Sequence, residues 1–172
     1  MANWQHCPAV ERDAGRHSGL WVFTGTDVPL YLLYEHLAAG GTVASFAEQR
    51  GVDPRQAASL LEYEADELHD YRLEFPDGVP WMNNPEGKAA GPDDTIWRTC
   101  SLVEQVPGIL CGVWVFNRSR FTLYTIYYNL ASGATIDNLA EWYYVDKDKV
   151  VAILQHQSNT LRENRKAYAD SV

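Results

Sequence analysis

The sequence lacks most of the patterns that carry chemistry in proteins of this size. Its five histidines have no HExxH-like spacing, and its three cysteines form no CxxC pair. It contains neither a GxSxG elbow nor a glycine-rich phosphate loop. We therefore expect a protein that is not an enzyme, with no catalytic residues, no metal site and no cofactor.

Long apolar runs and a leader pattern are missing as well. The longest apolar stretch, around residues 108–116, is much shorter than the roughly 20 residues that a helix needs to cross a bilayer. The first ten residues carry no basic start followed by an apolar run, so we expect no signal peptide. Cysteines without paired spacing are typical of free thiols in a reducing compartment. These features predict a cytoplasmic protein that does not bind membranes.

Basic residues are few and unevenly placed. The chain has 14 Lys and Arg against 23 Asp and Glu, a net charge of −9. Residues 1–71 hold 4 basic and 11 acidic residues, residues 72–96 hold 2 and 5, and residues 97–172 hold 8 and 7, giving −7, −3 and +1. An acidic first segment repels phosphates and attracts a basic protein surface. Any contact with nucleic acid is therefore expected from the last segment.

The chain does contain an internal repeat. A shift of 93 residues places residues 4–68 on residues 97–161, with 22 identities in 65 positions and no insertion. A constant offset over this length indicates one duplicated domain. We assign residues 1–71 to the first helix-turn-helix repeat, residues 72–96 to a Pro/Gly-rich linker and residues 97–172 to the second helix-turn-helix repeat.

The helix-turn-helix assignment comes from capping and turn residues. In the first repeat Thr42 can cap a short helix, and Asp53 can cap the long helix that follows it. Gly51 suits the corner between these helices, where positive φ is common. The second repeat has Thr135 and Asp146 at the capping positions, but Tyr144 where glycine would be expected.

The predicted fold is mainly α: two tandem three-helix helix-turn-helix domains, each preceded by a short β-strand or hairpin, packed as an internal pseudo-dimer. Each repeat buries only a modest core alone, so we expect the repeats to pack on each other. Residues 1–20 are expected to be an irregular or partly extended lead-in. We expect the strands near residues 21–24 and 113–117 to approach each other about the internal two-fold axis, which would satisfy their edge hydrogen bonds.

Side chains at the start of each long helix are candidates for DNA contact, because that part of a helix-turn-helix enters the major groove. They are Arg55 and Gln56 in the first repeat and Lys147 and Lys149 in the second. Further basic residues could hold phosphates: Arg118, Arg120, Arg162, Arg165 and Lys166. Acidic neighbours oppose this contact, so DNA binding by the second repeat alone is favoured over binding by both.

Aromatic residues form a stripe at helical spacing, with Phe121 at its start. Its tyrosines, with their counterparts in the first repeat, are the candidate partner-binding residues Tyr31, Tyr34, Tyr124, Tyr127 and Tyr128. Packing in the core or at a subunit contact explains such a stripe most simply, because tyrosine covers a large area and keeps a polar tip. A ligand or base-stacking role is the alternative.

Two segments carry a resemblance to a known family. Residues Trp4–Leu30 follow the pattern W-x-x-C-P-A-V-E-x-x-x-G-x-x-S-G-L-W-V-F-x-G-T-D-V-P-L, and Asn129–Trp142 follow N-L-A-S-G-A-T-I-D-x-L-A-E-W. Both resemble the bacterial family known as domain of unknown function 433. The resemblance implies a strand, a turn and three helices per copy, and an antitoxin that accompanies a PIN-like ribonuclease toxin. In the second copy R-S-R-F-T replaces G-T-D-V-P, which is a departure from the family pattern.

The expected function is therefore an antitoxin-like, non-enzymatic binding protein that neutralises a PIN-like nuclease toxin. Operator DNA is a further candidate ligand through the second repeat, and a homo-oligomer is a candidate assembly. The alternative is a scaffold or adaptor whose helix-turn-helix fold does not bind DNA. An enzyme that uses the aromatic helices as a pocket is the third interpretation.

Overall fold

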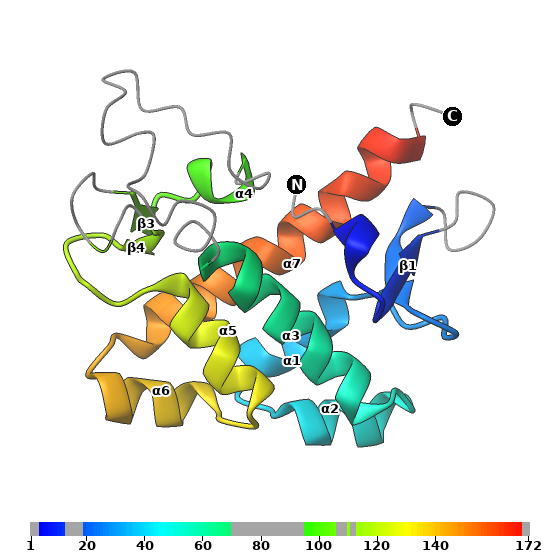
Figure 1. Ribbon diagram of the computed structural model, residues 1–172, viewed down its shortest axis with the longest axis horizontal. Coiled ribbons are helices and arrows are strands. Elements are labelled where there is room, and N and C mark those ends of the chain that lie inside the picture. Colours follow the sequence, from blue (N-terminus) through cyan, green and yellow to red (C-terminus); the bar gives the residue numbers. More distant parts are fainter. Residues whose placement is uncertain (1–3, 13–18, 70–94, 106–109, 111–112, 170–172) are drawn as a thin grey trace, which may run out of the picture.

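Helices make up most of the molecule (Figure 1). The computed structural model describes residues 4–12, 19–69, 95–105, 110 and 113–169. Within these ranges it has seven α-helices, one short 3-10 helix and two two-stranded antiparallel sheets. The predicted mainly helical fold with small β units is confirmed. No helix in the described ranges combines the length and apolar character that crossing a bilayer requires.

The first half runs through six elements before residue 70. They are η1 (Trp4–His6), β1 (Val10–Arg12), β2 (Trp21–Phe23), α1 (Tyr31–Ala38), α2 (Val43–Arg50) and α3 (Pro54–His69). A capping box starts α2, because the Thr42 hydroxyl accepts from the Ser45 N–H while the Ser45 hydroxyl accepts from the Thr42 N–H. Gly51 ends α2 with a left-handed φ of 68°, as its place at the corner predicts.

The second half repeats much of this order. Its elements are α4 (Thr95–Arg98), β3 (Val103–Glu104), β4 (Val115–Phe116), α5 (Leu123–Ala131), α6 (Ile136–Tyr143) and α7 (Lys147–Ala169). Thr135 and Asn138 form the capping box of α6. Tyr144 occupies the corner with a left-handed φ of 53°. The predicted linker, apart from residues 95–96 in α4, lies outside the described residues.

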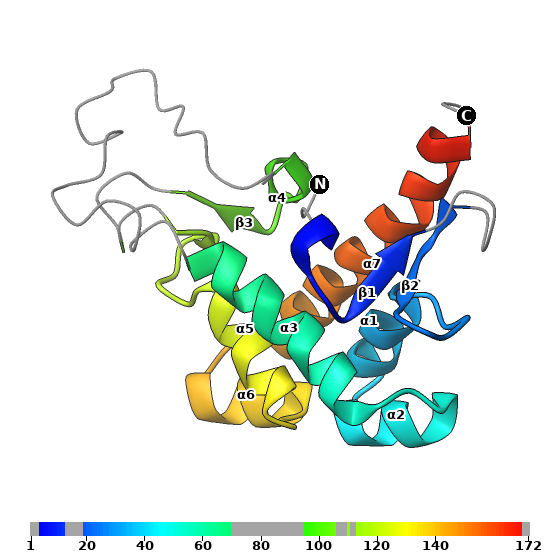
Figure 2. The same ribbon diagram turned by 45° about the vertical axis from the view of Figure 1, so that its right-hand side comes forward.

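The two sheets are separate, and each forms within its own half. β1 pairs with β2, with Val10 opposite Phe23, and β3 pairs with β4, with Val103 opposite Phe116. The sheets lie apart in both views, with β3 on the left and β1 on the right (Figures 1 and 2). The predicted approach of β2 and β4 is therefore wrong. A partner strand closer along the chain satisfies their hydrogen bonds, and in the first half this strand, β1, lies in the segment expected to be irregular or partly extended.

The helices of one half pack on those of the other. α3 lies along α5, and α1 lies along α7; these contacts are more extensive than any helix contact within either half (Figures 1 and 2). One hydrophobic core joins Leu33 and Leu60 of the first half to Ile126 and Leu154 of the second. α2 and α6 lie along the same lower side of the molecule in Figure 1. The α2–α3 corner and the α6–α7 corner thus lie on the same side of the molecule.

Candidate functional site

The corner between α2 and α3 carries two candidate DNA-binding residues, and only one of them is accessible to DNA. Arg55 is exposed, and its backbone N–H donates to the Asp53 carboxylate at 2.8 Å. Gln56 is half-buried, and its Nε2 donates to the Thr24 carbonyl oxygen at 2.8 Å. Gln56 therefore fastens α3 to the turn after β2, and its amide is already engaged, which argues against a role in reading bases.

The corner between α6 and α7 is less basic than the second half as a whole. Lys147 and Lys149 are exposed, and the Lys147 Nζ lies 2.5 Å from an Asp137 carboxylate oxygen. Residues 136–149 contain four acidic and two basic residues, a local net charge of −2. The net charge of +1 in residues 97–172 includes Arg162, Arg165 and Lys166, which belong to the far end of α7 (Figure 1). A phosphate at this corner would therefore meet more negative than positive charge.

The turn before α5 carries Arg118 and Arg120, both exposed. Arg118 has a left-handed φ of 60°, and its backbone N–H donates to a Glu104 carboxylate oxygen at 2.6 Å. The first half has the same turn, in which the Gly25 N–H donates to Glu11 at 3.1 Å. These arginines project from a turn that a glutamate holds in place.

The remaining basic candidates lie along α7. Arg162 forms an ion pair with Glu35, and its guanidinium carbon lies 4.3 Å from the centre of the Tyr31 ring. It therefore helps to join α7 to α1, and is engaged within the protein. Arg165 and Lys166 belong to α7, but their side chains lie outside the described residues.

The tyrosine stripe is mainly a packing feature. Tyr34 and Tyr127 are 0% exposed in the shared core, so neither can touch a partner directly. Tyr31 and Tyr124 are half-buried, and Tyr128 is 53% exposed. Tyr34 on α1 and Tyr127 on α5 both belong to the shared hydrophobic core, so their burial removes them from the candidate binding surface.

A buried polar cluster lies where the halves meet. We call it the central polar cluster: Trp4, Tyr34, Glu64, Tyr127 and Gln157. The Gln157 Nε2 donates to a Glu64 carboxylate oxygen at 2.7 Å, and both side chains are buried. Burial raises the pKa of Glu64 to about 8, although Tyr34, Gln157 and Trp4 favour its charged form. Glu64 is therefore mainly protonated at neutral pH, but only 4% of it is exposed, so a substrate has little access to it.

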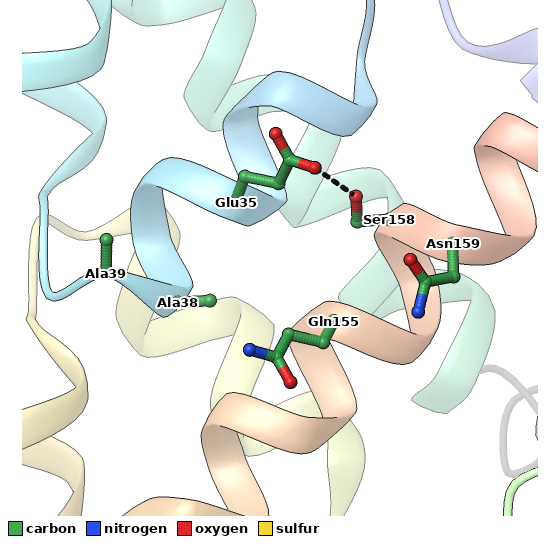
Figure 3. Close-up of a pocket in the computed structure, with 6 residues that line it drawn as sticks. All are labelled: Glu35, Ala38, Ala39, Gln155, Ser158 and Asn159. Carbon is green, nitrogen blue, oxygen red and sulfur yellow. Dashed lines mark hydrogen bonds between the residues drawn. The ribbon is translucent and has the colours of Figure 1, made fainter.

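An open groove of about 390 Å³ lies between α1 and α7 (Figure 3). It is lined by Glu35, Ala38, Ala39, Gln155, Ser158 and Asn159. The Ser158 hydroxyl donates to Glu35 at 3.2 Å, and Arg162 pairs with the same carboxylate. No aromatic side chain lines this groove, so it does not match the pocket of the enzyme interpretation. In the described part of the chain, no three His, Cys, Asp or Glu side chains are grouped to hold a metal ion.

The end of α6 exposes three consecutive aromatic residues, which we call the aromatic corner: Trp142, Tyr143 and Tyr144. They are 54%, 41% and 95% exposed. The Tyr143 ring lies 5.1 Å from that of Phe121, whereas Tyr144 is almost entirely in solvent. The 93-residue offset places Gln49, Arg50 and Gly51 at these positions in the first half. The aromatic corner is therefore specific to the second half.

Replacing Tyr144 with glycine is expected to stabilise the fold by about 1 kcal/mol, because it removes a side chain from left-handed backbone where it gains little packing. Urea unfolding of both proteins measures the change. As the matched control, Gly51→Ala at the equivalent φ of 68° should lower stability by a similar amount. A clear loss of stability in Tyr144→Gly would contradict this assignment.

The second half gives a family match. Residues 103–156 match the model of the family described as Protein of unknown function (DUF433). This segment runs from β3 into the middle of α7, so the match supports the family resemblance and covers one copy. No curated protein and no solved structure matched the chain.

Two features of this DUF433-like chain were not predicted from the sequence, although it holds a signal for each. They are the central polar cluster and the aromatic corner. The sequence holds a signal for the first, because the offset of 93 residues aligns Glu64 with Gln157, and these two polar side chains are hydrogen-bonded to each other. A signal for the second is the change from Gln49-Arg50-Gly51 to aromatic residues between otherwise similar copies.

Proposed function

We propose that this protein is an antitoxin-like, non-enzymatic binding protein of the cytoplasm, which neutralises a PIN-like nuclease toxin. The observation that carries the proposal is the aromatic corner, because exposed Trp and Tyr side chains are typical of protein interfaces. The net charge of −7 in residues 1–71 adds attraction for a basic partner. The antitoxin role itself comes from the resemblance to the DUF433 family, whose model matches residues 103–156.

We also propose that the chain is a tandem duplication whose halves dock as an internal pseudo-dimer. Three facts support it: the constant offset of 93 residues, the reciprocal contacts α1–α7 and α3–α5 between the halves, and the hydrogen bond between Glu64 and Gln157. The last joins two residues 93 positions apart, the separation expected for equivalent residues on a two-fold axis.

Operator DNA is a second proposed ligand. Its support is the set of exposed arginines Arg55, Arg118 and Arg120, which lie outside the acidic corner between α6 and α7. Mobility shifts with the DNA upstream of the gene test it. Phosphate contacts release counterions, so affinity should fall steeply between low and physiological salt. An equal and weak shift at both salt concentrations would favour the adaptor alternative.

The toxin assignment predicts that a ribonuclease co-purifies with the protein from its native host and that its RNA cleavage stops when the protein is added at a stoichiometric amount. Mass spectrometry identifies the partner, and a labelled RNA substrate measures inhibition. The protein alone, added to an unrelated ribonuclease, is the control. Co-purification without any nuclease would set aside the toxin assignment.

A further inference from the structure

The aromatic corner presents exposed aromatic rings next in sequence to one exposed carboxylate, Glu141. Trp142 and Tyr144 are 54% and 95% exposed, and Glu141 is an exposed neighbour in sequence. Tyr144 has a left-handed backbone conformation, which glycine adopts at a lower energetic cost than tyrosine. The exposed ring makes few packing contacts that would offset this cost. Its presence therefore calls for a role outside folding.

Elsewhere in this protein, an aromatic ring and a carboxylate together bind an arginine side chain. On α1, Tyr31 and Glu35 together bind Arg162: the guanidinium carbon lies 4.3 Å from the ring centre and the carboxylate forms the ion pair. The Arg12 guanidinium carbon also lies 5.6 Å from the ring centre of Trp21, and its Nε donates to the Gly19 carbonyl oxygen. A guanidinium group stacks on an aromatic ring and pairs with a carboxylate at the same time.

The local charge decides which class of ligand the aromatic corner can bind. Residues 136–149 have a net charge of −2, and Lys147 is already bound to Asp137. Phosphates of a nucleic acid would meet excess negative charge there, and a purely apolar partner would desolvate the carboxylates without pairing them. An arginine side chain satisfies both the rings and the carboxylates.

We propose that the aromatic corner, Trp142–Tyr144 with Glu141, is a docking surface for arginine side chains on a partner protein. The inference rests on the proposed function, because it takes the partner to be a protein. It adds that this partner presents arginine side chains. The corresponding corner of the first half, with Gln49 and Gly51, lacks the rings and does not share this role.

A fluorescent peptide of alternating glycine and arginine is the probe, used with the full chain in an anisotropy titration. We expect it to bind, and the Trp142 indole resonance to shift in nuclear magnetic resonance spectra. The matched lysine peptide should bind several-fold more weakly, because an ammonium group stacks less well on a ring. Tighter binding of an oligothymidine strand, or no shift at Trp142, would overturn the proposal in favour of nucleic acid or of no ligand.

The double variant Trp142→Gln/Tyr144→Gly gives positions 142 and 144 the residues that the first half has at Gln49 and Gly51. It is expected to lower the arginine-peptide affinity about tenfold. Gln49→Ala, at the equivalent exposed position of the first half, is the control and should leave affinity unchanged. Equal loss in both variants would refute the assignment. Sedimentation tests the other occupant: a wild-type dimer that the double variant abolishes would show that the corner binds a second copy.

The outcome separates this inference from the proposed function. A nuclease partner that binds both proteins equally keeps the proposed function and overturns the arginine site. If the double variant loses affinity for the peptide but no nuclease partner is found in the host, the arginine site is supported and the toxin assignment is overturned.

Discussion

Glu64→Gln is expected to raise the stability of the protein at pH 8 by several kcal/mol and to flatten its dependence on pH. Burial raises the pKa of the Glu64 carboxyl from 4.5 to about 8 in the folded protein. Between these values the folded state keeps the proton and the unfolded state loses it. Stability from this group is therefore complete below pH 4.5 and falls by roughly 1.4 kcal/mol per pH unit until the pH passes 8.

Thermal or urea unfolding between pH 5 and pH 9 measures this effect as the difference between wild type and variant. Glutamine keeps the acceptor for the Gln157 Nε2, so the packing of the cluster is retained. Glu62→Gln, on the exposed side of the same helix, is the control and should keep the wild-type slope. Parallel pH curves for wild type and Glu64→Gln would show that Glu64 ionises normally.

Separate halves of the chain, residues 1–69 and residues 95–172, are expected not to fold as monomers. Each leaves uncovered the helix face that packs on the other half in the α1–α7 and α3–α5 contacts. Mixing them should restore a cooperatively unfolding one-to-one complex. Circular dichroism and sedimentation equilibrium measure folding and association. A half that unfolds cooperatively as a monomer would contradict the shared core.

The proposed two-fold relation adds a sharper expectation for each half alone. A dimer of residues 1–69 would place two Glu64 carboxyls together, so it should associate more strongly at pH 5 than at pH 8. A dimer of residues 95–172 would pair two Gln157 amides and should show no such change. Gln157→Glu in that half is the matched variant, which should acquire the pH dependence.

Features that depend on neighbouring residues were predictable. The capping boxes at Thr42 and Thr135 require only a side chain three residues further on, and the Gly51 corner requires only the absence of Cβ. The mainly helical architecture follows from such local signals and from apolar spacing. Candidate site residues were less predictable, because the identity of Tyr34 or Tyr128 does not say which faces solvent; Tyr34 is 0% and Tyr128 53% exposed.

The sequence by itself determined the capping and corner residues of the helices, the 93-residue spacing of similar residues and the uneven charge, because each depends on residue identity along the chain. Only the tertiary structure decided that Glu64 meets Gln157, that Arg162 is bound by Glu35, and that the aromatic corner remains in solvent. These outcomes depend on how α1 crosses α7 and α3 crosses α5. Contacts between helices distant in the chain decide which side chains are buried, paired or exposed, and no local pattern encodes that choice.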